Sequence, residues 1–126
     1  MKILVLEDNE ERIAQFKKRL DRFGGYVFFC RTAKECIEIL KENADLQLVL
    51  LDHDLGGEVY VDTAHKNTGS EVARWMRDNY DMENTQIIIH SLNTVGAEYM
   101  RSQIPEAHVV PFVWTKEVFD KTVREK

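Results

Sequence analysis

The sequence predicts a doubly wound α/β fold, in which five parallel strands alternate with helices that cover both faces of the sheet. Short apolar runs and amphipathic segments alternate along all 126 residues. The runs are apolar at nearly every position, as expected for strands that are buried on both faces. The length suits one domain with a core of its own. We therefore expect residues 1–126 to form a single domain.

The first part of the chain predicts three strands and two helices. Residues 3–6, 26–30 and 47–51 are the apolar runs that predict the strands. Apolar residues spaced by three and four predict a first helix that stops at Gly24 and Gly25, with an inward stripe of Ile13, Phe16, Leu20 and Phe23. Thr32 and Glu35 have the form of a capping box and open a second helix, with an inward stripe of Ala33, Cys36, Ile37 and Leu40.

The rest of the chain begins with a polar segment, residues 55–68, that predicts a long loop. Its alternating piece at residues 59–61 would suit a small hairpin, and loops of this length are usually functional or mobile. Four further elements follow the loop. They are a helix over 69–80, a strand over 86–90, a helix over 95–103 and a short strand over 108–110. A closing helix is expected over residues 116–124.

Composition excludes several classes of function. Acidic residues (22) outnumber basic ones (17), and the net charge of −5 does not favour a protein that binds duplex DNA. The apolar runs are too short for a membrane span or a signal peptide. The two cysteines, Cys30 and Cys36, suit a reducing compartment. We therefore expect a cytoplasmic protein without a membrane partner.

Polar side chains stand where the predicted strands end. They are Glu7, Asp8 and Asn9, then Asp52, His53 and Asp54, then His90, Ser91 and Asn93. In doubly wound sheets the ligand crevice lies beyond the carboxyl ends of the strands, so these side chains should converge on one site. Carboxylates held together repel one another unless a cation lies among them. Oxygen ligands of this kind predict Mg²⁺ or Mn²⁺.

Helix capping is the alternative explanation for these acids. Helix N-termini favour Asp and Glu, which would account for Glu7 or Asp8 taken singly. Capping does not account for Asp52 at the end of a fully apolar strand, nor for the histidines beside it. The set as a whole indicates a site.

In these positions the chain resembles a bacterial response-regulator receiver domain, which has a flavodoxin-like (βα)5 fold. The matching residues are Glu7, Asp8, Asp52, Ser91 and the pair Pro111-Phe112. The resemblance implies that Asp52 is the phosphorylated aspartate, that the acidic pair holds magnesium and that Ser91 contacts the phosphoryl group.

Two further positions match the receiver pattern and two features depart from it. Asp54 corresponds to the residue whose backbone carbonyl ligates the metal, and Gly69 to the glycine that opens the third helix. Receivers carry a phosphate-binding lysine where this chain has Val110, which removes a charge-assisted contact. The segment between Asp52 and Gly69, which contains Asp62 and His65, is also longer than in receivers.

A narrower resemblance is to the cyclic-phosphate processing receiver-like domains, in which one histidine follows the aspartate and another precedes the hydroxyl residue. The motifs that carry it are Leu6-Glu7-Asp8, Asp52-His53-Asp54-Leu55, Thr68-Gly69 and His90-Ser91-Leu92-Asn93. The resemblance implies action on a cyclic phosphate rather than relay of phosphate from a kinase.

Each polar candidate has a functional and a structural interpretation. His53 and His90 would serve as general acid and base, as rim residues with only hydrogen bonds, or as metal ligands. Adjacent strand positions face opposite sides, which separates His90 from Ser91. Ser91 would donate to a phosphate oxygen or make a turn bond. Asn93 would contact substrate or cap a helix. For Arg12 we favour a surface ion pair over a phosphate contact.

The sequence therefore predicts a metal-dependent phosphoesterase that acts on a cyclic phosphate, such as a 2′,3′-cyclic phosphate on an RNA end or a small molecule. The metal would be held by Glu7, Asp8, Asp52 and Asp54, with Asp52 as ligand or as nucleophile. The catalytic residues would be Asp52, His53, His90 and Ser91, and the substrate contacts Ser91 and Asn93.

Two alternatives stay open. One is a stand-alone receiver or pseudo-receiver with Asp52 as phosphoacceptor and a protein partner. The other is a protein that binds a cyclic nucleotide without turning it over.

Overall fold

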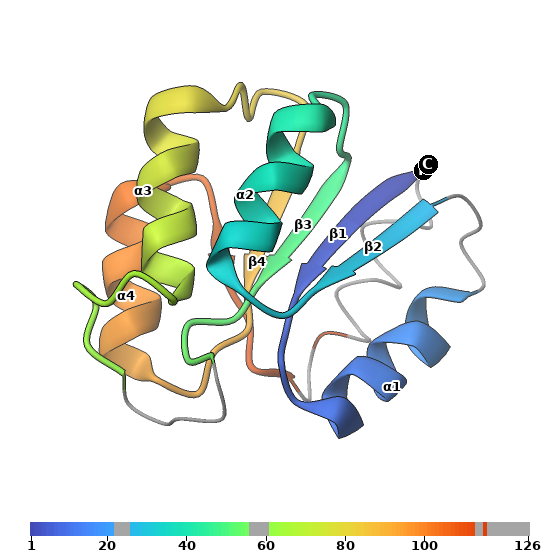
Figure 1. The fold of residues 1–126 in the computed structure, drawn as a ribbon, viewed down its shortest axis with the longest axis horizontal. Helices are drawn as coiled ribbons and strands as arrows, with labels where there is room; N and C mark the ends of the chain where they lie inside the picture. Colours follow the sequence, from blue (N-terminus) through green and yellow to red (C-terminus); the bar gives the residue numbers. More distant parts are fainter. Residues whose placement is uncertain (22–25, 56–60, 113–114, 116–126) are drawn as a thin grey trace.

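The computed structural model describes residues 1–21, 26–55, 61–112 and 115. Five parallel strands form one sheet in the order β2-β1-β3-β4-β5 (Figure 1). Their bounds are β1 Lys2–Leu6, β2 Tyr26–Cys30, β3 Leu48–Leu51, β4 Gln86–Ile89 and β5 His108–Val109. The order places β3 at the centre, between β1 and β4. The predicted doubly wound parallel sheet is confirmed.

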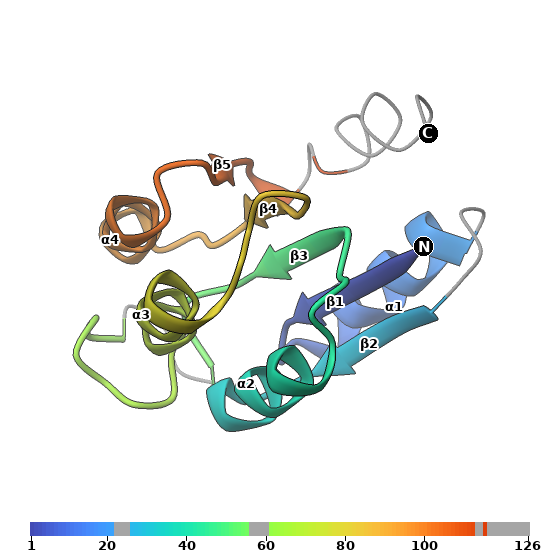
Figure 2. The ribbon, with the colours of Figure 1, turned by 90° about the horizontal axis from the view of Figure 1, so that it is seen from above.

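Four helices accompany the sheet in the described ranges. They are α1 Glu10–Leu20, α2 Ala33–Glu42, α3 Gly69–Asn79 and α4 Thr94–Gln103. Figures 1 and 2 show α1 on one side of the sheet and α2 and α3 on the other. Each helix begins at a side-chain cap, and the caps are Asn9, Thr32, Thr68 and Asn93.

The element boundaries differ slightly from the expected ones. α1 ends at Leu20, where the sequence pattern extended it to Phe23, and β4 ends at Ile89, so His90 lies just beyond the strand. The closing helix expected over residues 116–124, the glycine pair 24–25 and most of the expected hairpin at 59–61 lie outside the described residues.

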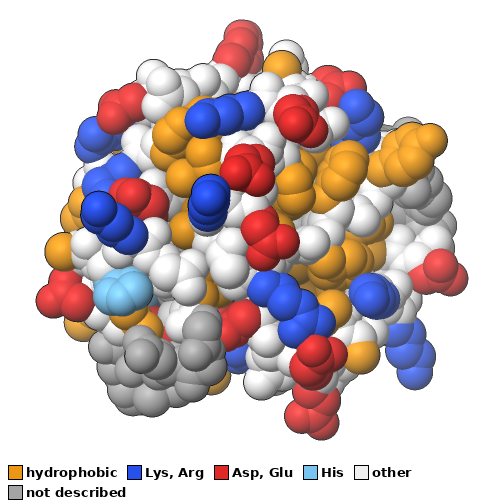
Figure 3. All heavy atoms as spheres, viewed as in Figure 1, with side chains coloured by type: hydrophobic (Ala, Val, Ile, Leu, Met, Phe, Trp, Pro, Cys, Tyr) orange, Lys and Arg blue, Asp and Glu red, His pale blue; other side chains and the backbone are white. Residues whose placement is uncertain are grey.

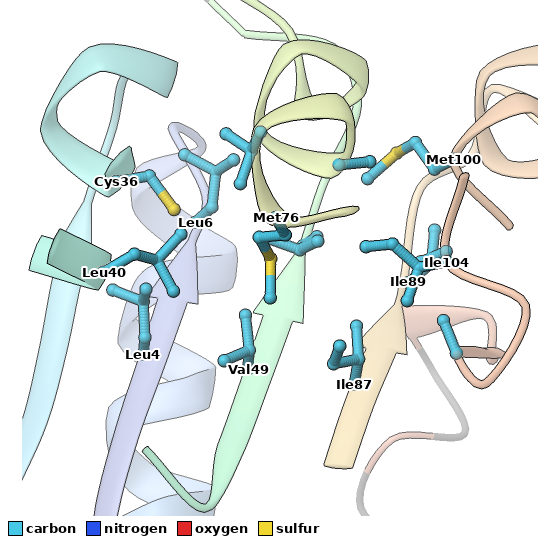
Figure 4. Packing of buried hydrophobic residues seen from close by; sticks show 14 of the residues in the cluster. Leu4, Leu6, Cys36, Leu40, Val49, Met76, Ile87, Ile89, Met100 and Ile104 are labelled. Carbon is cyan, nitrogen blue, oxygen red and sulfur yellow. The ribbon is translucent and has the colours of Figure 1, made fainter. Parts of the chain in front are cut away.

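The core has two parts, one on each face of the sheet, because strand residues alternate between faces. Leu4, Leu6, Val49 and Leu51 pack under α2, α3 and α4, as Figure 4 shows in part. The strand residues with the opposite orientation pack under α1 with Phe16 and Leu20. They are Ile3, Val5, Leu48, Leu50 and Ile88. Each fully buried leucine or isoleucine contributes about 2 kcal/mol to the free energy of unfolding.

The described end of the long loop, residues 61–68, is tied to the rest of the fold. Asp54 and Thr68 form an isolated antiparallel bridge. Asn67 Oδ1 accepts from the backbone N–H of Ala33, which attaches the loop to the start of α2. Asp62 and His65 make bonds within the loop itself, to the N–H groups of Ala64 and Asn67. Their contacts are those of turn residues.

The face seen in Figure 3 carries interspersed basic and acidic side chains, with apolar side chains between them. None of the helices in the described ranges combines the length and the apolar character that crossing a bilayer would require.

Gly69 allows α3 to start directly against the end of β3. Its N–H donates to the carbonyl oxygen of His53 at 3.0 Å. A Cβ at this position would lie 2.0 Å from the backbone oxygen of Asp52 and 2.7 Å from the Met100 side chain. The close approach therefore needs glycine, and it fixes the backbone that carries Asp52 and His53.

Replacement of Gly69 by alanine should lower the free energy of unfolding by about 3 kcal/mol, because the backbone on both sides must shift. Urea denaturation measures the loss. The matched control is Ser70→Ala in the same helical turn, since the buried Ser70 hydroxyl has no hydrogen-bond partner among the described residues. Ser70→Ala should leave the free energy of unfolding unchanged or raise it slightly. Equal stabilities for Gly69→Ala and the wild type would contradict the packing described here.

Candidate functional site

The side chains of Glu7, Asp52 and His90 meet beyond the carboxyl ends of β1, β3 and β4. One ligand atom from each lies within 4.8 Å of the other two, and all three residues are buried. The strand alternation explains the meeting. Each residue continues the row of its strand that faces α1, and the ring of His90 packs edge-on against Phe16 of α1 with centroids 5.0 Å apart. Because β3 lies between β1 and β4, the three rows end side by side.

Glu7 is the most extensively bonded member of the group. Its Oε2 accepts from the backbone N–H groups of Asp8 and Asn9, both at 3.1 Å, and from Arg12 Nη2 at 3.2 Å. Its Oε1 lies 3.1 Å from His90 Nε2. Burial works against ionisation, but the hydrogen bond from His90, the charge of Arg12 and the backbone bond from Asn9 outweigh it and lower the pKa of Glu7. Glu7 is therefore an anion.

Asp52 is buried with one oxygen bonded and the other not. Its Oδ1 accepts from the backbone N–H of His53 at 2.8 Å. Its Oδ2 has no hydrogen-bond partner within the described part of the chain. Burial, reinforced by the negative charge of Glu7, raises the pKa of Asp52 to about 8. Two acids at this spacing do not readily ionise together without a further cation.

His90 is completely buried, and burial lowers its pKa despite the bond to Glu7. A neutral imidazole beside the ionised Glu7 carries its proton on Nε2, which donates to Glu7 Oε1. Its Nδ1 is then unprotonated, and it has no partner among the residues described. His90 thus meets Glu7 through Nε2 and keeps a lone pair on Nδ1.

Arg12 belongs to the same group, although its place on the first helix favours a surface ion pair. Its Nε instead lies 3.1 Å from Glu7 Oε1, and its Nη2 lies 3.6 Å from Asp52 Oδ2. The only sequence signal was its place in the first turn of α1, which starts three residues after Glu7.

His53 belongs to a second group on the opposite side of the sheet. Its Nδ1 lies 2.9 Å from Asp54 Oδ1. Its ring lies against the first turn of α4, where a Cβ on Gly96 would come within 2.5 Å of it. Asn93 Nδ2 donates to Asp54 Oδ1 at 3.0 Å and to the carbonyl of Val61 at 3.3 Å. The structure thus places the two histidines on different faces, with only His90 beside Glu7.

The remaining candidates lie around these two groups. The carboxylates of Asp8, which is partly exposed, and of Asp54 are outside the close ligand group. The receiver resemblance assigns Asp54 a role through its backbone carbonyl, which its side-chain bonds leave unaffected. Asn93 caps α4 by accepting from the N–H of Gly96. Ser91 Oγ accepts from the N–H of Asn93, and Ser91 also lines a cavity of about 580 Å³ beside α4.

The buried group fits a divalent cation. Asp52 Oδ2 lacks a hydrogen-bond partner in the described ranges, and the two carboxyl groups are hard oxygen donors of the kind that Mg²⁺ and Mn²⁺ prefer. His90 Nε2 would add a nitrogen donor once it releases the proton that it donates to Glu7, and such a donor suits Mn²⁺ better than Mg²⁺.

Comparison with solved structures identifies the fold. The signal receiver domain of a putative Luxo repressor protein from Vibrio parahaemolyticus matches with a TM-score of 0.68 and 18% identity, over 98% of this chain and 90% of that one. A CheY-like receiver domain from Methanospirillum hungatei matches with a TM-score of 0.69 and 18% identity, over 98% and 94%. The Mn²⁺-bound response regulator Rcp1 gives 0.73 and 14%, over 99% and 96%. The fold is that of a receiver domain.

The sequence comparison gives the family. Residues 2–106 match the family described as the cyclic-phosphate processing receiver domain, and the chain belongs to it. A search of curated proteins found no significant match. The receiver lysine position is Val110, and its side chain packs on the apolar cluster under α1.

The raised pKa of Asp52 predicts a pH-dependent stability. The folded state holds the Asp52 proton up to about pH 8, whereas the unfolded chain loses it near its ordinary value of 3.8. Folding is therefore disfavoured progressively as pH rises between these values. In metal-free buffer, Asp52→Asn should be more stable than the wild type at pH 8, and its advantage should exceed that at pH 5 by about 2 kcal/mol or more.

Urea denaturation at pH 5 and pH 8 measures this difference. Asp45→Asn is the matched control, because the Asp45 side chain is 67% exposed and pairs only with Lys2 in the described structure. The stability of Asp45→Asn should match that of the wild type at both pH 5 and pH 8. If the free energies of unfolding of Asp52→Asn and the wild type changed equally between pH 5 and pH 8, the raised pKa of the buried Asp52 would be contradicted.

Proposed function

We propose that the protein is a metal-dependent phosphoesterase that opens a cyclic phosphate, such as a 2′,3′-cyclic phosphate on an RNA end or a nucleotide. The observation that carries the proposal is the buried group of Glu7, Asp52 and His90 at the carboxyl edge of the sheet. Membership in the cyclic-phosphate processing receiver family supports the type of substrate.

The proposed metal ligands are the carboxyl groups of Glu7 and Asp52, together with Asp8 and the carbonyl of Asp54. Mg²⁺ or Mn²⁺ held there would lower the pKa of a bound water and neutralise charge on the phosphate. A fold neighbour, Rcp1, is known in a Mn²⁺-bound form. Metal binding would require Asp52 to lose its proton, so the cation should bind more tightly as pH rises toward 8.

His90 is the proposed proton acceptor. Its Nε2 is held by Glu7, which leaves Nδ1 with an open lone pair. In the proposed reaction the oxygen of water bonds to phosphorus and one ester P–O bond of the ring breaks. A proton leaves the water for the imidazole, and the imidazolium then gives that proton to the released alkoxide oxygen, which restores neutral His90. The lowered pKa of His90 keeps the imidazole in the basic form near neutral pH.

The residues on the other face have proposed substrate-binding and positioning roles. The Ser91 hydroxyl accepts from Asn93 N–H and keeps its own proton for a phosphate oxygen. The cavity beside Ser91, of about 580 Å³, falls in the size range of small-molecule sites and would hold the organic part of the substrate. His53, Asp54 and Asn93 would hold the loop from Val61 onward against α4.

A cytoplasmic location fits this proposal. Cys30 and Cys36 are free thiols in the buried core. A reducing compartment keeps such thiols in this form.

Turnover of 2′,3′- and 3′,5′-cyclic nucleotides with Mn²⁺ or Mg²⁺ tests the proposal. Wild type should open at least one ring, and Asp52→Asn should lower the rate by about 100-fold or more, because the site loses a charged ligand. Glu106→Gln is the control, since Glu106 is exposed and precedes β5, at the opposite end of the sheet from the site. Absence of turnover across the panel, with Mn²⁺ binding intact, would sink the enzymatic proposal.

The second candidate is a stand-alone receiver module with Asp52 as phosphoacceptor. The buried Asp52 Oδ2, which lacks a hydrogen-bond partner among the described residues, favours it. Acetyl phosphate or beryllofluoride in the presence of Mg²⁺ separates the two functions. Modification of Asp52 without ring opening would support the receiver module. Tight binding of a cyclic nucleotide without either reaction would indicate a sequestering protein.

A further inference from the structure

Arg12 neutralises the buried acids of the candidate site. Its guanidinium lies against both oxygens of Glu7, with Nε 3.1 Å from Oε1 and Nη2 3.2 Å from Oε2. The same Nη2 lies 3.6 Å from the unbonded Oδ2 of Asp52. The described structure therefore has a cation bridging the two carboxyl groups that a metal would use.

A metal and the guanidinium would compete for the same oxygens. A divalent cation binds carboxylate oxygens at about 2.0–2.6 Å and uses one lone pair of each. The guanidinium donates to Glu7 Oε2 and approaches Asp52 Oδ2, so a metal bound to both oxygens would take up space and lone-pair directions that the guanidinium now uses. Like charges at such distances also repel strongly in a buried site.

The Arg12 side chain is able to leave. It is 23% exposed, whereas the side chains of Glu7 and Asp52 are 0% and 3% exposed. Its backbone N–H is held by Asn9 Oδ1 at the cap of α1, so the start of the helix stays fixed while the side chain moves. Nε lacks a hydrogen bond to any described residue in the present position.

We propose that Arg12 is a built-in counterion that a divalent cation displaces from Glu7 and Asp52, and that the displaced guanidinium then binds the phosphate group of the substrate. A divalent ion balances the charges of both buried carboxylates. Arg12 is then a cation without a buried anion, at the rim of the site where phosphate would bind. Its planar fork suits two phosphate oxygens. The phosphate part of this inference rests on the proposed function.

Binding measurements on Arg12→Met test the inference without any turnover. Calorimetric titration with Mn²⁺ should show about tenfold tighter metal binding than in the wild type, because the competing cation is gone. Equilibrium dialysis of the Mn²⁺-loaded protein with inorganic phosphate should show about tenfold weaker phosphate binding. A residue with a purely structural role would not move the two affinities in opposite directions.

Two further variants complete the test. Lys18→Met removes the same charge from an exposed position on α1 and should leave both affinities near those of the wild type. Arg12→Lys retains the charge and should recover phosphate binding in part. Unchanged or weaker Mn²⁺ binding by Arg12→Met, or unchanged phosphate binding, would overturn the inference. Neither the Mn²⁺ titration nor the phosphate dialysis depends on catalysis. A failure of the proposed ring opening can therefore be told apart from a failure of this inference.

Discussion

The repulsion between two acids buried at the ends of adjacent parallel strands is the constraint on which the site depends. Glu7 follows β1 and Asp52 follows β3, so the sheet itself holds the two carboxyl groups together. The fold compensates in part through Arg12, His90 and the N–H groups of the turn after β1. Asp52 remains the unbalanced member, as its raised pKa shows. The affinity for a cation that we propose follows from that arrangement.

Strand alternation divides the functional residues between two layers. Glu7, Asp52 and His90 share the α1 face, where Phe16 packs against the histidine ring. His53 lies on the face of α4, where Gly96 leaves room for its ring. The charged group therefore lies at the strand ends on the α1 side of the sheet. The loop from Val61 and the cavity near Ser91 lie at the same strand ends on the other side. The division gives the two histidines different partners.

Periodicity was sufficient to predict the sheet and the four described helices. The rule for strand ends predicted the meeting of Glu7, Asp52 and His90, but not the separate group around His53. The expected separation of His90 from Ser91 also follows from alternation, since neighbouring positions face opposite sides. The position of Arg12 did not follow, because helix spacing describes neighbours on one helix and its partners lie at the ends of two strands. Gly96 was missed for a similar reason. Its role depends on the ring of His53, which is distant in sequence.

Anomalous scattering from crystals soaked in Mn²⁺ would show whether a cation replaces Arg12 between Glu7 and Asp52. We expect a peak within coordinating distance of the carboxyl oxygens of Glu7 and Asp52, with the Arg12 guanidinium moved away from them. A peak only at other acidic side chains would rule out a cation site between these two acids. A fully occupied ion with Arg12 still bridging Glu7 and Asp52 would contradict the displacement of Arg12.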